Sequence, residues 1–160
     1  MLRILALLAT LLVPSAAAAG FDDGVDAWLR GDFARAAAEW GPLAESGHAQ
    51  AANNLARMAE LGQGGPVDEA AAARWFRVAA ERGHPQAQAS LGEYYAERRG
   101  GLDDPEAACL WLLLARRAWP EESGGRRYVD FQLARLRPRL SDEQFADVEA
   151  QAQAWAPRRD

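Results

Sequence analysis

The sequence predicts an all-α fold, a short right-handed α-solenoid of stacked helical hairpins with terminal capping helices. After residue 19 it contains no Ile, no Thr and five Val, so the β-branched residues that β-sheets favour are scarce. Good helix formers, above all Ala, Leu, Arg, Glu and Gln, dominate this part of the chain. A period of 36 residues indicates repeated helical units, which bury their apolar faces by stacking on one another.

The first 19 residues are typical of a signal peptide. Arg3 gives a positively charged start, and Ile4 to Val13 form an apolar stretch that is too short for a membrane span of about 20 residues. Small residues follow, and Ala17 and Ala19 fit the A-x-A pattern that precedes cleavage. We therefore expect cleavage near Ala19 and a periplasmic or secreted protein. An uncleaved N-terminal anchor is the alternative.

The remaining residues, 20–160, have the size of one domain. They include no apolar run of about 18 residues, so no transmembrane segment is expected in the mature chain. The whole sequence has a net charge of −5 with both signs interspersed, which disfavours nucleic acid as a partner. Lysine is absent, which excludes a P-loop and Schiff-base chemistry. The single cysteine, Cys109, excludes an intrachain disulfide and suits a small core residue better than a reactive thiol.

A first helical unit is expected over about residues 21–46. The apolar spacing of Phe21 and Val25 predicts one helix, Gly31 follows its end, and Trp40 lies on a second helix.

Two further units, about 47–82 and 83–118, contain the repeat itself. Rare residue types recur after 36 positions, namely Gly47 and Gly83, His48 and His84, Gly64 and Gly100, Asp68 and Asp104, and Trp75 and Trp111. Within a unit, Ala51, Leu55 and Ala59 lie on one face of the first helix. The Trp of the second helix is expected to fill the space between units, and the Gly after it to end that helix in a left-handed conformation.

Residues 124–156 are expected to form the C-terminal capping helices. One helix passes through Val129 and ends at Pro138. Ser141 and Gln144 form a capping box that begins the last helix, which we expect to fold back over the final unit.

These residues resemble the Sel-one-like repeat family, a branch of the tetratricopeptide-like helical solenoids. Pro85 to Tyr95 is similar to the first half of the family's unit, and the second half is matched by Gly64, Asp68, Ala72, Trp75, Ala79, Ala80 and Gly83. Arg98 replaces an expected Gly, and Trp119-Pro120 replaces the third glycine turn. The resemblance covers most of residues 21–155. It implies a scaffold for protein–protein contacts that has no catalytic residues.

The candidate binding surface is the concave groove formed by the first helices of the units. The partner-binding residues predicted for it are Asn54, Arg57, Met58, Ser90, Glu93 and Tyr94. Met58 and Tyr94 either supply apolar contacts in the groove or complete the packing between helices. Trp119, in the irregular loop after the third unit, is a second candidate anchor.

Other motifs have simpler explanations. Gly62 to Gly65 suggests a phosphate cradle, but its glycines recur 36 residues later and no Lys is present. His48 and His84 occupy the same turn of successive units, and two histidines alone do not form a zinc site, so no metal is predicted. The carboxylates of Asp103-Asp104 and of Glu121-Glu122 are sequence neighbours that point apart, which argues against an acid–base pair.

Together these features predict an exported, non-catalytic scaffold or adaptor that needs no cofactor and binds a protein or peptide of the cell envelope. The main alternative is a cell-envelope enzyme or glycan-binding protein acting on the cell wall, but no convergent set of titratable residues indicates one. A structural module that oligomerises through its end caps is a third hypothesis.

Overall fold

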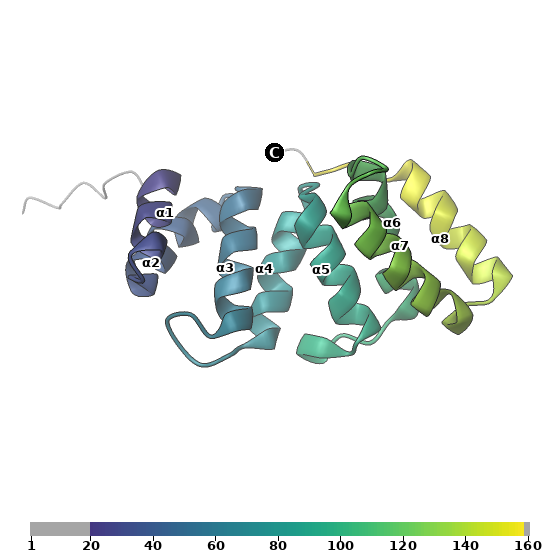
Figure 1. Ribbon diagram of the computed structural model, residues 1–160, viewed down its shortest axis with the longest axis horizontal. Coiled ribbons are helices and arrows are strands. Elements are labelled where there is room, and N and C mark those ends of the chain that lie inside the picture. Colours follow the sequence, from purple (N-terminus) through teal and green to yellow (C-terminus); the bar gives the residue numbers. More distant parts are fainter. Residues whose placement is uncertain (1–19, 159–160) are drawn as a thin grey trace, which may run out of the picture.

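The computed structural model describes residues 20–158, which form helices and contain no strand. Each of the second to seventh helices packs against the one before it, the eighth packs against the sixth, and the helices follow one another along the long axis of the molecule (Figure 1). Their bounds are α1 Phe21–Leu29, α2 Phe33–Glu45, α3 Ala49–Leu61, α4 Glu69–Glu81, α5 Pro85–Ala96, α6 Pro105–Ala118, α7 Gly124–Leu136 and α8 Asp142–Ala154, with short 3-10 turns η1 Arg99–Gly101 and η2 Arg137–Arg139. The predicted solenoid of helical hairpins is confirmed.

The predicted signal peptide, residues 1–19, lies outside the described residues. Between residues 20 and 158, no helix has the length and apolar character needed to cross a membrane.

The two repeated histidines begin the first helices of their units. His48 Nδ1 accepts a hydrogen bond from the Ala51 amide at 3.2 Å, and His84 Nδ1 accepts one from the Ala87 amide at 3.3 Å. Burial lowers the pKa of His84, which favours the neutral ring that this acceptor role requires. Both rings therefore satisfy helix N-termini, as their position in the turn predicted.

Glycines with positive φ follow the helices of the repeats. Gly83 has φ 84°, which confirms the predicted left-handed residue after α4. Gly62 ends α3 with φ 66° and ψ 29°. Arg98, which replaces glycine at the equivalent position after α5, adopts nearly the same conformation, with φ 62° and ψ 31°.

Alanines bring the helices close together, and a few large side chains fill the space that remains. Two clusters of buried residues form the core, one from α1 to α5 and the other from α5 to α8. The first cluster contains Phe76, which has no exposed surface, and its ring meets that of Tyr94 edge-on at 5.5 Å.

The expectation that the repeat tryptophans fill the space between units is only partly correct. Trp75 and Trp111 are half-buried, and Phe76 lies deeper than Trp75. Successive helical residues point about 100° apart, so the residue next to Trp75 faces the core while the indole lies at the edge of the hairpin.

The C-terminal helices depart from the regular stacking. Both α7 and α8 pack against α6, which confirms that the last helix folds back over the final unit. Ser141 and Gln144 form the predicted capping box. After α8 the chain turns back along the edge of the solenoid, as Figure 1 shows near the C-terminal label.

Candidate functional site

The solvent-facing side chains of α3 and α5 form matching stripes. On α3 the stripe is Gln50, Asn54, Arg57 and Leu61, and on α5 it is Gln86, Ser90 and Glu93, continued by Glu97 directly after the helix. Each member is exposed or half-buried, and the members are related by the 36-residue period. We use the name A-helix face for these two stripes together with the exposed side chains Trp28 and Leu29 of α1 and Tyr128, Phe131 and Arg135 of α7.

Four of the six residues predicted for the groove lie on the A-helix face, and they are Asn54, Arg57, Ser90 and Glu93. The prediction that Met58 and Tyr94 are partly exposed is wrong, because they are only 5 % and 1 % exposed. Each follows a stripe residue directly and so points about 100° away from it, towards the neighbouring helices. Both complete the packing between helices, which was the alternative interpretation.

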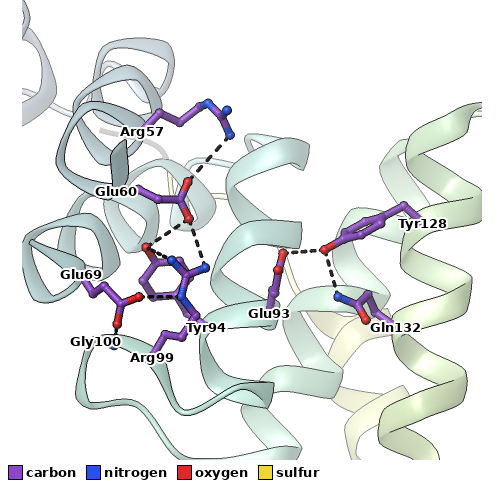
Figure 2. A network of polar contacts seen from close by, with 9 residues as sticks. All are labelled: Arg57, Glu60, Glu69, Glu93, Tyr94, Arg99, Gly100, Tyr128 and Gln132. Carbon is purple, nitrogen blue, oxygen red and sulfur yellow. Dashed lines mark hydrogen bonds and ion pairs between the residues drawn. The ribbon is translucent and has the colours of Figure 1, made fainter. Parts of the chain in front are cut away.

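Tyr94 belongs to a network of polar contacts that holds η1 against the preceding unit (Figure 2). Its hydroxyl donates to Glu60 Oε1 at 3.2 Å. The Arg99 guanidinium lies 4.2 Å from the centre of the Tyr94 ring and forms ion pairs with Glu60 at 3.2 Å and Glu69 at 2.8 Å. Burial, followed by the charge of Glu60, raises the pKa of Tyr94, so the phenol stays neutral. These groups stabilise the repeat.

A pocket of about 330 Å³ opens on the A-helix face between α1 and α3. Its lining is apolar along Val25, Trp28, Trp40 and Leu61, with polar groups from Asn54, Arg57 and Gln63. The Trp28 indole N–H donates to Gln63 Oε1 at 2.9 Å and so is held at the pocket wall.

Arg57 provides the positive charge of this pocket. Its side chain is 45 % exposed, and its ion pair with Glu60 is long, at 3.9 Å. Glu60 is already engaged by Arg99 and Tyr94, which leaves the Arg57 guanidinium well placed to bind an additional acceptor.

The stripe of α5 meets α7 through a second polar group, also drawn in Figure 2. The Tyr128 hydroxyl donates to Glu93 Oε2 at 2.6 Å and accepts from Gln132 Nε2 at 2.9 Å. Burial, followed by the hydrogen bond and charge of Glu93, raises the pKa of Tyr128 to about 12. One helical turn further, Phe131 is 61 % exposed, with the Arg135 guanidinium 5.7 Å from its ring centre.

The remaining candidates occupy structural positions. Trp119 is half-buried, and its indole lies against Gly125 of α7 so closely that a Cβ there would approach it to 2.7 Å. It holds the loop to α7 while part of its surface remains exposed, and its role as a second anchor stays a prediction. Asp104 caps α6, and Asp103 pairs with Arg98 at 3.1 Å.

Cys109 is buried, and burial raises the pKa of its thiol to about 11, which suits a core residue. Among the described residues, no group of three or more His, Cys, Asp or Glu side chains is arranged to hold a metal ion.

Sequence reasoning missed the exposed aromatic residues at the two ends of the A-helix face, Trp28, Tyr128 and Phe131. Leu61 could have been predicted from the sequence, because it lies four residues after Arg57 and therefore on the same side of α3. Phe131 was harder to find, because α7 is displaced from the 36-residue period.

Comparison with known proteins agrees with this architecture. The Sel1 repeat family matches residues 49–84 and 85–118. A solved structure with a similar fold is that of a protective antigen present in uropathogenic Escherichia coli strains, which displays an SLR fold. It is 24 % identical in sequence, with a TM-score of 0.67, and the match covers 82 % of this chain and 28 % of the antigen chain. No curated protein matches the sequence.

Proposed function

Because the chain contains two Sel1 repeats, at residues 49–84 and 85–118, we propose that it is a non-catalytic scaffold that binds a peptide segment of a partner protein on its A-helix face. Sel1 repeats commonly serve as protein-interaction scaffolds, and this fold is the premise of the proposal.

The observation that carries the proposal is the distribution of exposed apolar side chains. Among the described residues, the large hydrophobic side chains with substantial exposure are Trp28, Leu29, Leu61, Val67, Tyr128 and Phe131. All of these except Val67 lie on α1, α3 and α7, and none lies on α2, α4, α6 or α8. The exposed aromatic side chains stand towards the two ends of the A-helix face, and exposed aromatic residues are enriched at interaction sites.

The pocket between α1 and α3 indicates what kind of group would bind. Its volume and apolar walls suit one bulky hydrophobic side chain of a peptide. Asn54, Arg57 and Gln63 then provide hydrogen bonds to the polar groups that flank such a side chain, and Arg57 favours a carboxylate among them. A peptide with a large apolar residue beside an acidic one satisfies both conditions.

We also propose that this scaffold acts in the cell envelope after export. The support is the sequence of residues 1–19, with its positive start, short apolar stretch and A-x-A site. The mature protein recovered from its native host should begin at Gly20 in N-terminal sequencing. A chain that keeps Met1 and sediments with membranes would contradict the proposal of export.

The test of binding begins with a selection of peptides from a random displayed library on residues 20–160. The peptide that binds most tightly is then titrated by calorimetry into residues 20–160 and into each variant of them. We expect Arg57→Glu and Trp28→Ala each to weaken binding by about 2 kcal/mol, which is the size of a hot-spot loss. Both side chains are partly exposed at the pocket, so the melting temperature should change little.

A matched control makes the same charge change elsewhere. Arg74 is exposed on α4, outside the A-helix face, and Arg74→Glu should leave peptide affinity unchanged. Equal losses for Arg57→Glu and Arg74→Glu would show a nonspecific charge effect and contradict the assigned site. Saturable binding of soluble cell-wall glycan fragments that Trp28→Ala removes, without any selected peptide, would replace the peptide proposal by the glycan-binding alternative.

A further inference from the structure

The four residues after α8 lie across the edge of the solenoid and bind it as an extended peptide would. We call Trp155–Arg158 the C-terminal tail and Glu81, Gly83, Trp111 and Arg117, which contact it, the edge groove. The tail leads from α8 past α6 to the end of α4, as the chain near the C-terminal label of Figure 1 shows.

The aromatic and proline side chains of the tail each have a matching surface. The Trp155 ring meets the Trp111 ring edge-on, with centroids 6.4 Å apart. The Pro157 ring lies over Gly83, where a Cβ would come within 3.1 Å of the proline Cγ. A glycine with φ 84° at this point therefore serves the turn after α4 and also leaves room for the proline.

Polar contacts fix the direction and register of the tail. Arg117 donates to the Trp155 carbonyl at 3.3 Å. The backbone N–H of Arg158 donates to the Glu81 carbonyl at 2.8 Å, and its guanidinium pairs with the Glu81 carboxylate at 2.8 Å. Trp111 thus contacts the aromatic ring, Gly83 the proline, and Glu81 both the backbone amide and the guanidinium of Arg158. Peptide-binding domains recognise extended segments through such a combination of main-chain and side-chain contacts.

We propose that the edge groove is a second peptide-binding site, independent of the A-helix face, and that the chain's own tail occupies it as a tethered competitor. The partner is an extended protein segment in which an aromatic residue is followed, after one residue, by Pro-Arg. Such a segment makes the same contacts as the tail and binds by displacing it. Because the tail is tethered, its effective concentration is on the order of millimolar, and it suppresses binding of weaker segments.

The test uses a fluorescent peptide with the sequence of residues 152–160 and measures its anisotropy against residues 20–160. In a released variant, Trp155→Ser with Arg158→Glu, the edge groove loses its tethered ligand. We expect the peptide to bind this variant at least tenfold more tightly than the unmodified chain. Arg158→Glu alone replaces the ion pair of an exposed side chain by repulsion from Glu81 and leaves Trp155 and Pro157 in place, so it should give an intermediate affinity and a native melting curve.

Specificity is tested by adding Glu81→Arg to the released variant, which should weaken peptide binding at least tenfold. Glu121→Arg makes the same charge change at an exposed position of the loop after α6 and should have no effect. Equal affinity of the unmodified and released chains, or the absence of saturable binding by a folded released variant, would overturn the proposal. Because Arg57 and Trp28 are not part of the edge groove, this outcome is distinct from failure of the A-helix face.

Discussion

At the scale of single residues, the positions that depart from the repeat period are informative. Arg98 replaces a glycine yet keeps the left-handed backbone of Gly62 one unit earlier. A residue with a Cβ in that backbone conformation destabilises the fold by about 1 kcal/mol relative to glycine. The ion pair between Arg98 and Asp103 is exposed, so it offsets little of this loss. We expect Arg98→Gly to raise the free energy of unfolding by about 0.5–1 kcal/mol in urea titrations. Arg98→Ala, which keeps the Cβ and loses the ion pair, should give no gain. A gain of equal size in both variants would contradict the backbone explanation.

Tyr94 is the residue whose assignment the structure changes most. Its ring packs on Phe76 and under Arg99, and its hydroxyl binds Glu60, all inside the repeat. Tyr94→Ala should therefore lower the free energy of unfolding by about 3–5 kcal/mol, as expected for a buried aromatic residue. Tyr94→Phe keeps the ring packing and should cost about 1 kcal/mol through the lost hydrogen bond. If Tyr94→Ala lowered the free energy of unfolding by less than about 1 kcal/mol in urea titrations, the side chain would have to lie at the surface, which would contradict its place in the core.

At the scale of helices, α5 and α6 approach each other closely at Gly92. A Cβ on Gly92 would lie 2.8 Å from Leu112 Cγ and 3.1 Å from the Ala108 carbonyl oxygen, and Leu112 is fully buried. Alanine normally stabilises a helix by about 1 kcal/mol relative to glycine. Here we expect Gly92→Ala to destabilise the chain by about 1–3 kcal/mol, because packing strain outweighs propensity.

The control for this prediction is Gly124→Ala at the start of α7, where a Cβ would meet only the tip of Arg127 at 3.9 Å. It should be neutral or slightly stabilising in the same urea titration. If both alanines stabilised the chain, α5 and α6 would have to be able to separate without cost.

The sequence predicted the helices well because their signals are local. Spacing, caps and glycine turns recur every 36 residues, and each of them acts within a few residues of the chain. The sequence predicted less well which side chains of a helix are exposed, because apolar periodicity does not indicate how many other helices pack around it. Met58 and Tyr94 follow stripe residues, and only the helices packed on either side of α3 and α5 make them buried. Trp155 to Arg158 have no helical period, and their contacts on α4 and α6 are far away in sequence, so no local pattern indicates the edge groove.

At the scale of the whole molecule, the chain is a row of units with two core clusters. They meet at α5, which gives Leu91 and Tyr94 to the first cluster and Ala89 to the second. In such a linear array, contacts between neighbouring units determine whether the array unfolds as one. The C-terminal tail adds a connection of a different kind, because Arg158 joins the end of the chain to Glu81 in α4. We infer that the tail couples the C-terminal cluster to the earlier one.

This coupling can be measured through Cys109, which is buried in the second cluster, so we expect its thiol to react only when that cluster opens. Burial raises the pKa of its thiol to about 11, so at pH 8 the folded chain presents almost no thiolate to an alkylating reagent.

In urea titrations at pH 8, we expect thiol labelling and the loss of helical circular dichroism to coincide for residues 20–160. In Trp155→Ser with Arg158→Glu, labelling should begin at a lower urea concentration than the dichroism midpoint, because the second cluster then opens on its own. Glu121→Arg should keep the two transitions together. Coincident transitions in the released variant would show that packing across α5 is sufficient to couple the two clusters and that the tail contributes nothing to their cooperativity.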